Sequence, residues 1–312
     1  MVGVSERGER SATSGAASVF ARPSALDLGL ILVGIAGIST SAVFIRKAAA
    51  PSFAVAFWRN AMASAVLVPL TFVRASRRRE LRAASPRSVR LSVLSGLLLG
   101  AHFAAWIPSL SFTSIASSTA LVATQPIWAA VMARAAGHHI PRRAAMGILV
   151  AVSGAFVVTG GDLHVSGRAF GGDVLAMLGA ITAAAYVTVA ARARETLSTG
   201  VHTALCFSAA AFSLLALALA SRTPLVGFGG STWEWIVALT VGAQLLGHAV
   251  FNIVLKTTSA TVVSVSILFE IVGASLLAWA WFHERPPVRF VPAALLVGVG
   301  AIIVVRGDRT RA

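Results

Sequence analysis

Ten stretches of mostly apolar residues follow one another along the chain, and they constrain its fold more than any other feature. A transmembrane α-helix needs roughly 20 such residues, and backbone groups inside a bilayer must hydrogen-bond within their own segment. The sequence therefore predicts an all-α integral membrane protein with ten transmembrane helices. The expected spans are Leu26–Ile45, Phe53–Val73, Leu91–Leu110, Ile115–Ala133, Ala144–Gly160, Gly172–Ala191, Thr203–Ala220, Trp233–Leu255, Thr261–Phe282 and Val288–Val305.

The composition excludes the soluble classes of protein. The 312 residues are 57% hydrophobic and 12% charged, whereas soluble domains have roughly 25% charged residues. The net charge of +15 does not indicate nucleic-acid binding, because the basic residues lie between the apolar runs, where they meet anionic lipid. A single cysteine, Cys206, excludes an internal disulfide and a cysteine metal cluster. We expect no cofactor and no metal; the expected partners are a small solute, protons and the lipid bilayer.

The distribution of positive charges predicts the orientation in the membrane. With both termini in the cytoplasm, the inside segments hold 19 Lys and Arg residues and the outside segments hold 6, as the positive-inside rule requires. We expect a multi-pass protein of the cell (inner) membrane with cytoplasmic tails at residues 1–24 and 308–312, the first of them disordered. Lys47 and Arg59 are expected near the outer face. There they either draw in an anion or, as we favour, reach toward lipid headgroups.

A weak internal repeat runs through the chain at a shift of about 146 residues, which indicates two related structural units. Gly154 aligns with Gly300, and at a shift of 145 Gln125 aligns with Glu270. Each unit has five spans, so the second enters the membrane from the opposite side. Inverted repeats of this kind are typical of secondary transporters, because two such halves can open a shared site to either side. The two predicted repeats are residues 25–165 and 166–307.

Several segments carry a family resemblance that covers residues 26–306. They are SAVFIRKAAAPSFAVAFWRNAMASAVLVPL from residue 41, ASSTALVATQPIWAAVMARAAG from residue 116 and SATVVSVSILFEIVGASLLAWAWFHERP from residue 259. These segments resemble the first and second, fourth, and ninth helices of the EamA-type branch of the drug/metabolite transporter superfamily. The resemblance implies a ten-helix transporter of small solutes with a central cavity bordered by spans one, three, four, six, eight and nine.

Glu270 is the leading candidate among polar residues inside the spans. A charge near the bilayer centre costs about 2.5–3.5 kcal/mol on insertion scales, so such groups face the bundle interior. Glu270 lies near the middle of span nine and shares a helix face with Ser266. Because apolar surroundings penalise its charged form, Glu270 is a candidate proton carrier. The alternative is a structural hydrogen bond to a neighbouring helix.

Span eight carries a polar stripe of Gln244, His248 and Asn252, spaced at i, i+4 and i+8. This spacing places all three on one helix face, where they could line an aqueous path or hold the ammonium and carboxylate of a solute. Hydrogen bonding between helices is the alternative. His248 is the second candidate for proton coupling.

His102 and Trp106 share a face of span three in the same way. Trp106 could stack on a planar or cationic solute; its alternative role is that of a tryptophan at the membrane interface. His102 lies deeper, which favours a place on the solute path.

Three further places complete the expected path. Pro126 in span four breaks the backbone ladder beside Gln125, which suits a binding site or hinge, although a simple kink is the alternative. Tyr186, Thr40 and Ser41 occupy matching places in spans six and one, and the resemblance implies that they also border the cavity.

Secondary active export of a small polar metabolite, an amino acid or related compound, is the function that the sequence favours. Glu270 or His248 would couple this transport to protons by alternating access. The alternatives are an efflux pump for cationic drugs, with Glu270 as counter-charge, an intramembrane enzyme acting on lipid, and a non-transporting sensor. We expect no enzyme, because an inverted repeat serves two-sided access. The sequence does not specify the substrate, the coupling ion, the direction of transport or the oligomeric state, and it is compatible with a homodimer.

Overall fold

The computed structural model describes residues 24–112, 118, 121–137, 139–159, 167–282 and 289–307. The two predicted tails lie outside these ranges, except for Ser24. Every regular element in the described ranges is a helix. The elements are α1 Ala25–Ser39, α2 Ser41–Ala48, α3 Ser52–Phe72, α4 Ala75–Ala83, α5 Pro86–Phe112, α7 Gln125–Ala135, α8 Arg142–Thr159, α9 Gly167–Arg194, α10 Thr199–Ala220, α11 Gly230–Leu239, the π-helix η1 Thr240–Ala249, α12 Val250–Val254, α13 Ala260–Ile267, α14 Phe269–Phe282 and α15 Phe290–Gly307.

The helices have the length and apolarity of membrane spans. Among the described residues, seven segments are long and apolar enough to cross a bilayer, and Phe290–Arg306 is a shorter apolar helix. The other two expected spans fall on α8, and on α7 together with residues outside the described ranges. The predicted all-α membrane fold is therefore confirmed. The seven segments are Ala25–Ala48, Ser52–Phe72, Pro86–Phe112, Gly167–Arg194, Thr199–Ala220, Gly230–Val254 and Ala260–Trp281.

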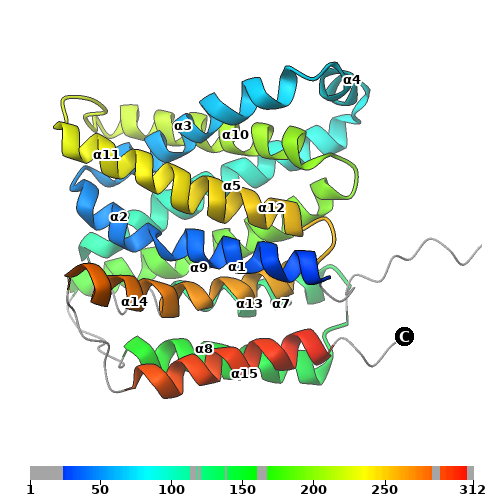
Figure 1. The fold of residues 1–312 in the computed structure, drawn as a ribbon, viewed down its shortest axis with the longest axis vertical. Helices are drawn as coiled ribbons and strands as arrows, with labels where there is room; N and C mark the ends of the chain where they lie inside the picture. The colour runs from blue at the N-terminus through cyan, green and yellow to red at the C-terminus, as the bar shows by residue number, and fades with distance from the viewer. Residues whose placement is uncertain are drawn as a thin grey trace, which may run out of the picture.

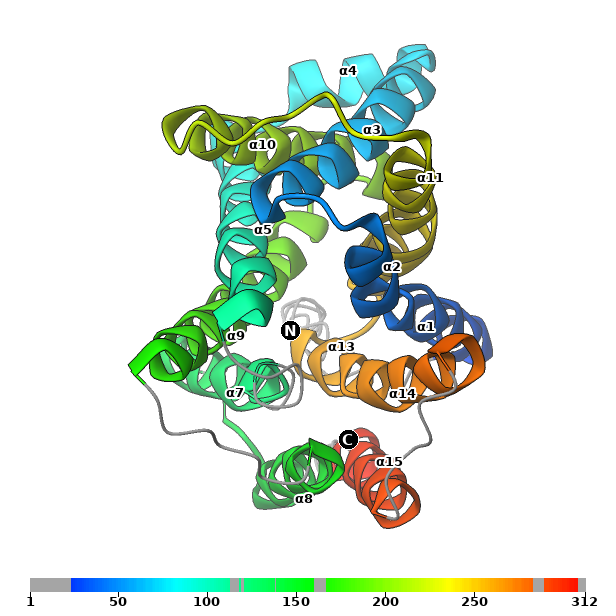
Figure 2. The same cartoon turned by 90° about the vertical axis from the view of Figure 1, so that its left-hand side faces the viewer.

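The long helices run side by side in one bundle, as Figure 1 shows, with α4 at one end. The first described helix begins and the last one ends at this same end, which we call the α4 end; the opposite end is the far end. Viewed along the helices, α8 and α15 form a pair at one side of the other helices (Figure 2). An even number of crossings accounts for the first described helix beginning and the last one ending at the same end.

Helix contacts follow the pattern expected for two inverted five-helix repeats. The first span (α1) packs against the eighth (η1), and its repeat equivalent, the sixth span (α9), packs against the third (α5). The same correspondence relates the α7–α9 contact to the α14–α1 contact. Two further pairs, α3 with α10 and α8 with α15, join equivalent spans of the two repeats. The two halves therefore pack against each other around a pseudo-twofold axis.

Several spans are interrupted near the middle of the bundle. The first span breaks at Thr40, whose hydroxyl and backbone N–H both donate to the Gly37 carbonyl, at 2.7 Å and 3.2 Å. Span four turns at residues 123–124, directly before Gln125 and Pro126, and span nine turns at Leu268. Residues 123 and 268 are 145 apart, so the breaks in spans four and nine occupy equivalent places in the repeats. Discontinuous helices of this kind surround the binding sites of many transporters.

Glycines allow the closest approach between α8 and α15. A Cβ atom at Gly300 would lie 2.4 Å from the backbone nitrogen of Ala151, and one at Gly147 would lie 2.8 Å from the carbonyl oxygen of Gly300. Because association of helices in lipid depends on close van der Waals packing, small residues at this interface stabilise the pair.

Candidate functional site

A narrow polar cavity lies between the two repeats. Its volume is about 30 Å³, which is room for a water molecule or two and far too little for a metabolite. An adjoining space of similar size shares five of its lining residues. The cavity is lined by Ile38, Ser41, His102, Trp106, Val122, Gln125, Ala183, Tyr186, Val187, His248, Ile267 and Glu270.

A wider vestibule of about 320 Å³ lies between the cavity and the far end. Ser41 and Trp106 line the cavity, while their chain neighbours Ala42 and Ile107 line the vestibule. Arg46 and Ser52, at the α2–α3 connection, line its outer part. The vestibule therefore lies on the far-end side of the cavity, and the two spaces share no lining residue.

Glu270 and Gln125 stand at equivalent places of the two repeats and both line the cavity. Each lies directly after the break in its span, at the start of α14 and of α7. Gln125 donates through Nε2 to Ser264 Oγ at 3.3 Å, which joins α7 to α13 of the other repeat. Glu270 is partly exposed, and its side chain lines the cavity.

Aromatic rings form one wall of the cavity. His102 and Trp106 stack with their ring centroids 5.6 Å apart and their planes 10° from parallel, and His102 Nδ1 lies 2.9 Å from the Gly179 carbonyl oxygen. His248 packs edge-on against Phe103 at 5.4 Å and faces Tyr186 at 6.1 Å. Trp106 is 6% exposed, so it lies inside the bundle and not at the lipid interface.

The polar stripe of span eight faces the protein interior, but its three members have different partners. Gln244 does not line the cavity; its Nε2 donates to Asn60 Oδ1 at 2.9 Å. His248 lines the cavity. Asn252 accepts through Oδ1 from the Tyr186 hydroxyl at 2.9 Å, and Tyr186 itself lines the cavity. Of the candidates in span one, Ser41 lines the cavity, whereas Thr40 forms the break beside it.

The favoured role of Arg59, a side chain that reaches toward lipid headgroups, was wrong. Its side chain does not extend toward headgroups but is fully buried, with its guanidinium 4.1 Å from the centre of the Phe103 ring. Nε donates to Gln244 Oε1 at 2.9 Å and Nη1 donates to Ser41 Oγ at 3.3 Å. The partner Gln244 is 185 residues away in sequence. The α3–η1 contact that buries Arg59 is therefore not visible in the local pattern.

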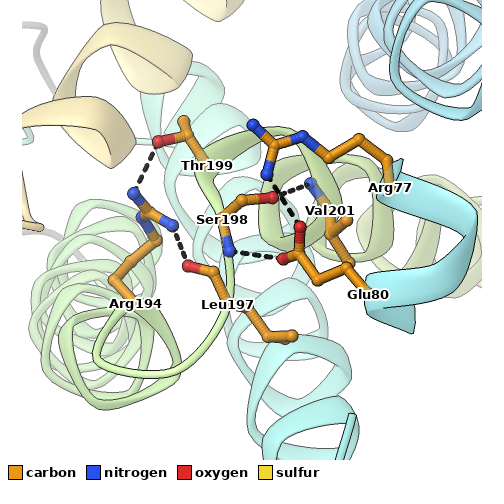
Figure 3. A network of polar contacts seen from close by, with 7 residues as sticks. All are labelled: Arg77, Glu80, Arg194, Leu197, Ser198, Thr199 and Val201. Atoms are coloured by element: carbon orange, nitrogen blue, oxygen red, sulfur yellow. Dashed lines mark hydrogen bonds and ion pairs between the residues drawn. The ribbon is translucent and has the colours of Figure 1, made fainter. Parts of the chain in front are cut away.

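A polar network closes the bundle at the α4 end (Figure 3). Arg194, at the end of α9, is 2% exposed; its guanidinium donates to the Leu197 carbonyl, to Thr199 Oγ1 and, through Nε, to the Asn252 carbonyl at 3.0 Å. The last of these bonds joins α9 to α12. Thr257, beyond α12, donates to Asp27 of α1 at 2.7 Å, which adds a second tie at this end.

Glu80 of α4 connects the same network to the surface helix. Its carboxylate accepts from the Ser198 backbone amide at 2.6 Å and from Arg77 at 2.7 Å. Burial acts to raise the pKa of Glu80, but these hydrogen bonds outweigh it and hold the pKa below its usual value. Glu80 and Arg194 were not among the predicted site residues. The sequence signal for Arg194 is its place next to the short connection between α9 and α10, and that for Glu80 is its place as an acid within the basic segment between α3 and α5.

No cluster of His, Cys, Asp and Glu side chains within the described residues has the arrangement of a metal site.

A polytopic helical bundle of two inverted repeats, with interrupted helices around a shared polar cavity, has the architecture of a solute transporter.

Comparison with known proteins agrees with this class. The chain belongs to the EamA-like transporter family, whose model matches residues 27–160 and 170–306, once in each repeat. It is therefore a transporter of the drug/metabolite type. One solved crystal structure superimposes on it with a TM-score of 0.75 at 21% identity, covering 91% of this chain and 99% of the other; this likeness shows the fold. No curated protein sequence matches the chain.

Proposed function

We propose that this protein is a secondary active transporter that exports a small polar metabolite, an amino acid or a related compound, by alternating access. The observation that carries the proposal is the cavity between the repeats, with a wider space on its far-end side and the Arg194 network at the α4 end. In the orientation that the charge distribution predicts, the α4 end is cytoplasmic. Opening this end while closing the far end would carry a solute across.

Proton coupling is assigned to Glu270, with His248 as the second candidate. Both side chains line the cavity, so a proton bound there changes the charge that a solute meets. An ionisable group inside a membrane span costs about 2.5–3.5 kcal/mol on insertion scales, so its presence there favours a role in the transport path. We propose that protonation of Glu270 alternates with, or accompanies, solute binding.

Efflux of cationic drugs is the second candidate function. The stacked rings of His102 and Trp106 and the carboxylate of Glu270 on the same cavity would suit a planar cation. This version predicts that cells with the protein resist lipophilic cations, and a growth-inhibition panel measures that directly.

Flux into and out of proteoliposomes tests the proposal. Purified protein is reconstituted with a mixture of labelled amino acids, and flux is measured with and without a pH gradient. We expect gradient-dependent flux for the wild-type protein and pH-independent, slower flux for Glu270→Gln. Glu234→Gln is the matched control, because Glu234 is an exposed acid at the far end. A Glu270→Gln variant with the rate and pH response of the wild type would remove the proton role.

A further inference from the structure

Arg59 is a buried charge whose protein partners are all neutral. Its side chain has no exposed surface; Nε and Nη1 donate to the amide of Gln244 and the hydroxyl of Ser41, and Nη2 has no hydrogen-bond partner. No carboxylate lies within 4.0 Å of it among the described residues. Removing a charged group from water costs several kcal/mol, and neutral acceptors recover only part of that cost. Glu270 acts on Arg59 only from beyond this distance, so the guanidinium lacks an anion in direct contact.

Arg59 lies directly behind the wall of the cavity. Ser41, which accepts from Nη1, is itself a lining residue. The charge of Arg59 acts on Glu270, His102 and His248, all of which line the cavity. Because electrostatic interactions are strong where water is excluded, an anion inside the cavity would be attracted by this guanidinium.

Two further features make the cavity favourable to an anion. Trp106 lines the cavity, and its indole Nε1, a donor only, is buried without a partner. Helix α7 begins at the lining residue Gln125, so the positive end of its dipole lies at the cavity. Helices α2 and α14 also begin there, but α1 and α13 end at the same breaks, so their opposite dipole ends offset one another. Glu270 is the one carboxylate among the lining residues.

We infer that Arg59 is the anion-binding group of the cavity and takes a carboxylate of the transported solute, with Trp106 Nε1 as a second donor. This inference rests on the proposed function and narrows its substrate class to solutes that carry a carboxylate. The weak 3.3 Å bond from Nη1 to Ser41 is the one the carboxylate replaces, so that Nη1 and Nη2 together form the planar fork that fits two oxygens. An ammonium group on the same solute would face Glu270.

Binding to the purified protein tests the carboxylate site directly. The probes are two matched sets: 3-phenylpropanoate, 2-phenylethylamine and phenylalanine, and isocaproate, isopentylamine and leucine. The shift of the unfolding temperature with probe concentration gives each apparent Kd. We expect the acids and amino acids of at least one set to stabilise the wild-type protein and the matched amines to have little effect.

Substitution then assigns the effect to Arg59. A hydrogen bond to a charged group corresponds to about a tenfold or larger change in affinity, so Arg59→Gln is expected to bind the carboxylates at least tenfold more weakly. Arg194→Gln is the control, because Arg194 is the other large, fully buried cation but each of its three nitrogens has a partner. It is expected to keep the preference for acids over amines.

The possible results separate this inference from the proposed function. Equal binding of acids and amines, no response to any carboxylate, or a preference that survives in Arg59→Gln would overturn the carboxylate site. If Arg59→Gln does not fold, the wild type decides, because it must prefer 3-phenylpropanoate to its uncharged methyl ester. Flux of a solute without a carboxylate would refute this inference but leave transport standing. Arg59-dependent binding without any flux would support the carboxylate site and refute transport.

Discussion

Removing the Arg194 guanidinium should loosen the closure at the α4 end. Two of its three hydrogen bonds, to Leu197 and Thr199, stay within the α9–α10 connection. Only the 3.0 Å bond from Nε to the Asn252 carbonyl crosses to α12, so only this bond must break when α9 and α12 separate. A hydrogen bond from a charged donor contributes about 1.5–3 kcal/mol. Arg194→Gln should therefore raise the population open at this end by roughly 10- to 150-fold.

Cysteine alkylation measures that population. Ala183 lines the cavity from α9, so Ala183→Cys places a reporter thiol there, while the native Cys206 is fully buried and supplies the background. A membrane-impermeant maleimide is applied from the α4 side of oriented vesicles. While the open state is the minor one, the alkylation rate rises in proportion to its population.

Arg192→Gln is the matched control, because it removes the same charge two residues earlier from an exposed position. An alkylation rate unchanged by Arg194→Gln, or raised equally by Arg192→Gln, would refute the role of the cross-helix bond. If Arg194→Gln raised the alkylation rate from the far side alone, the Arg194 bonds would hold the far end closed and not the α4 end.

Two further predictions concern stability. Gly300→Leu should destabilise the α8–α15 pair by about 1–3 kcal/mol, seen as a lower unfolding temperature by intrinsic fluorescence, whereas Gly298→Leu, with open space around it, should not. Glu80→Gln should also lower the unfolding temperature at neutral pH. Because the pKa of Glu80 is held below its usual value in the folded protein, its contribution is present above the unfolded-state pKa and lost as pH falls through the lower folded-state value. The difference from wild type should therefore begin to shrink at about pH 4 and vanish only below the lower folded-state pKa. Glu195→Gln, at an exposed acid, should behave as wild type at every pH, and a Glu80 effect that persists in acid would contradict the argument.

Hydropathy and periodicity were sufficient for the fold and for much of the cavity. The runs of apolar residues set the helices, and the cost of polar groups in lipid pointed to Glu270, His248 and His102, which the structure brings to one cavity. The alignment of Gln125 with Glu270 also identified two positions that lie at equivalent helix breaks. These features depend on the composition and order of residues within a span, which the sequence displays directly.

The errors concern contacts between distant spans. Arg59 stands near the start of its apolar run, where a lone cation usually reaches headgroups, and only the packing of α3 against η1 reveals Gln244 as its partner. Arg194 contributed to the charge count of an inside loop, yet it is buried because the α9–α10 connection folds over it. Charge counting treats basic residues alike and cannot separate a structural arginine from a topological one.

The equivalent helix breaks carry unlike side chains, Gln125 in one repeat and Glu270 in the other. A transporter assembled from two identical subunits must repeat every residue at its shared site, so an acid at this position would appear twice and bring two negative charges. Because both halves belong to one chain, the residues at the two positions can differ. One can then hold a neutral amide across the interface to α13 while the other keeps a single titratable group. The protein thus keeps the symmetric arrangement of two halves while its cavity has two chemically different sides.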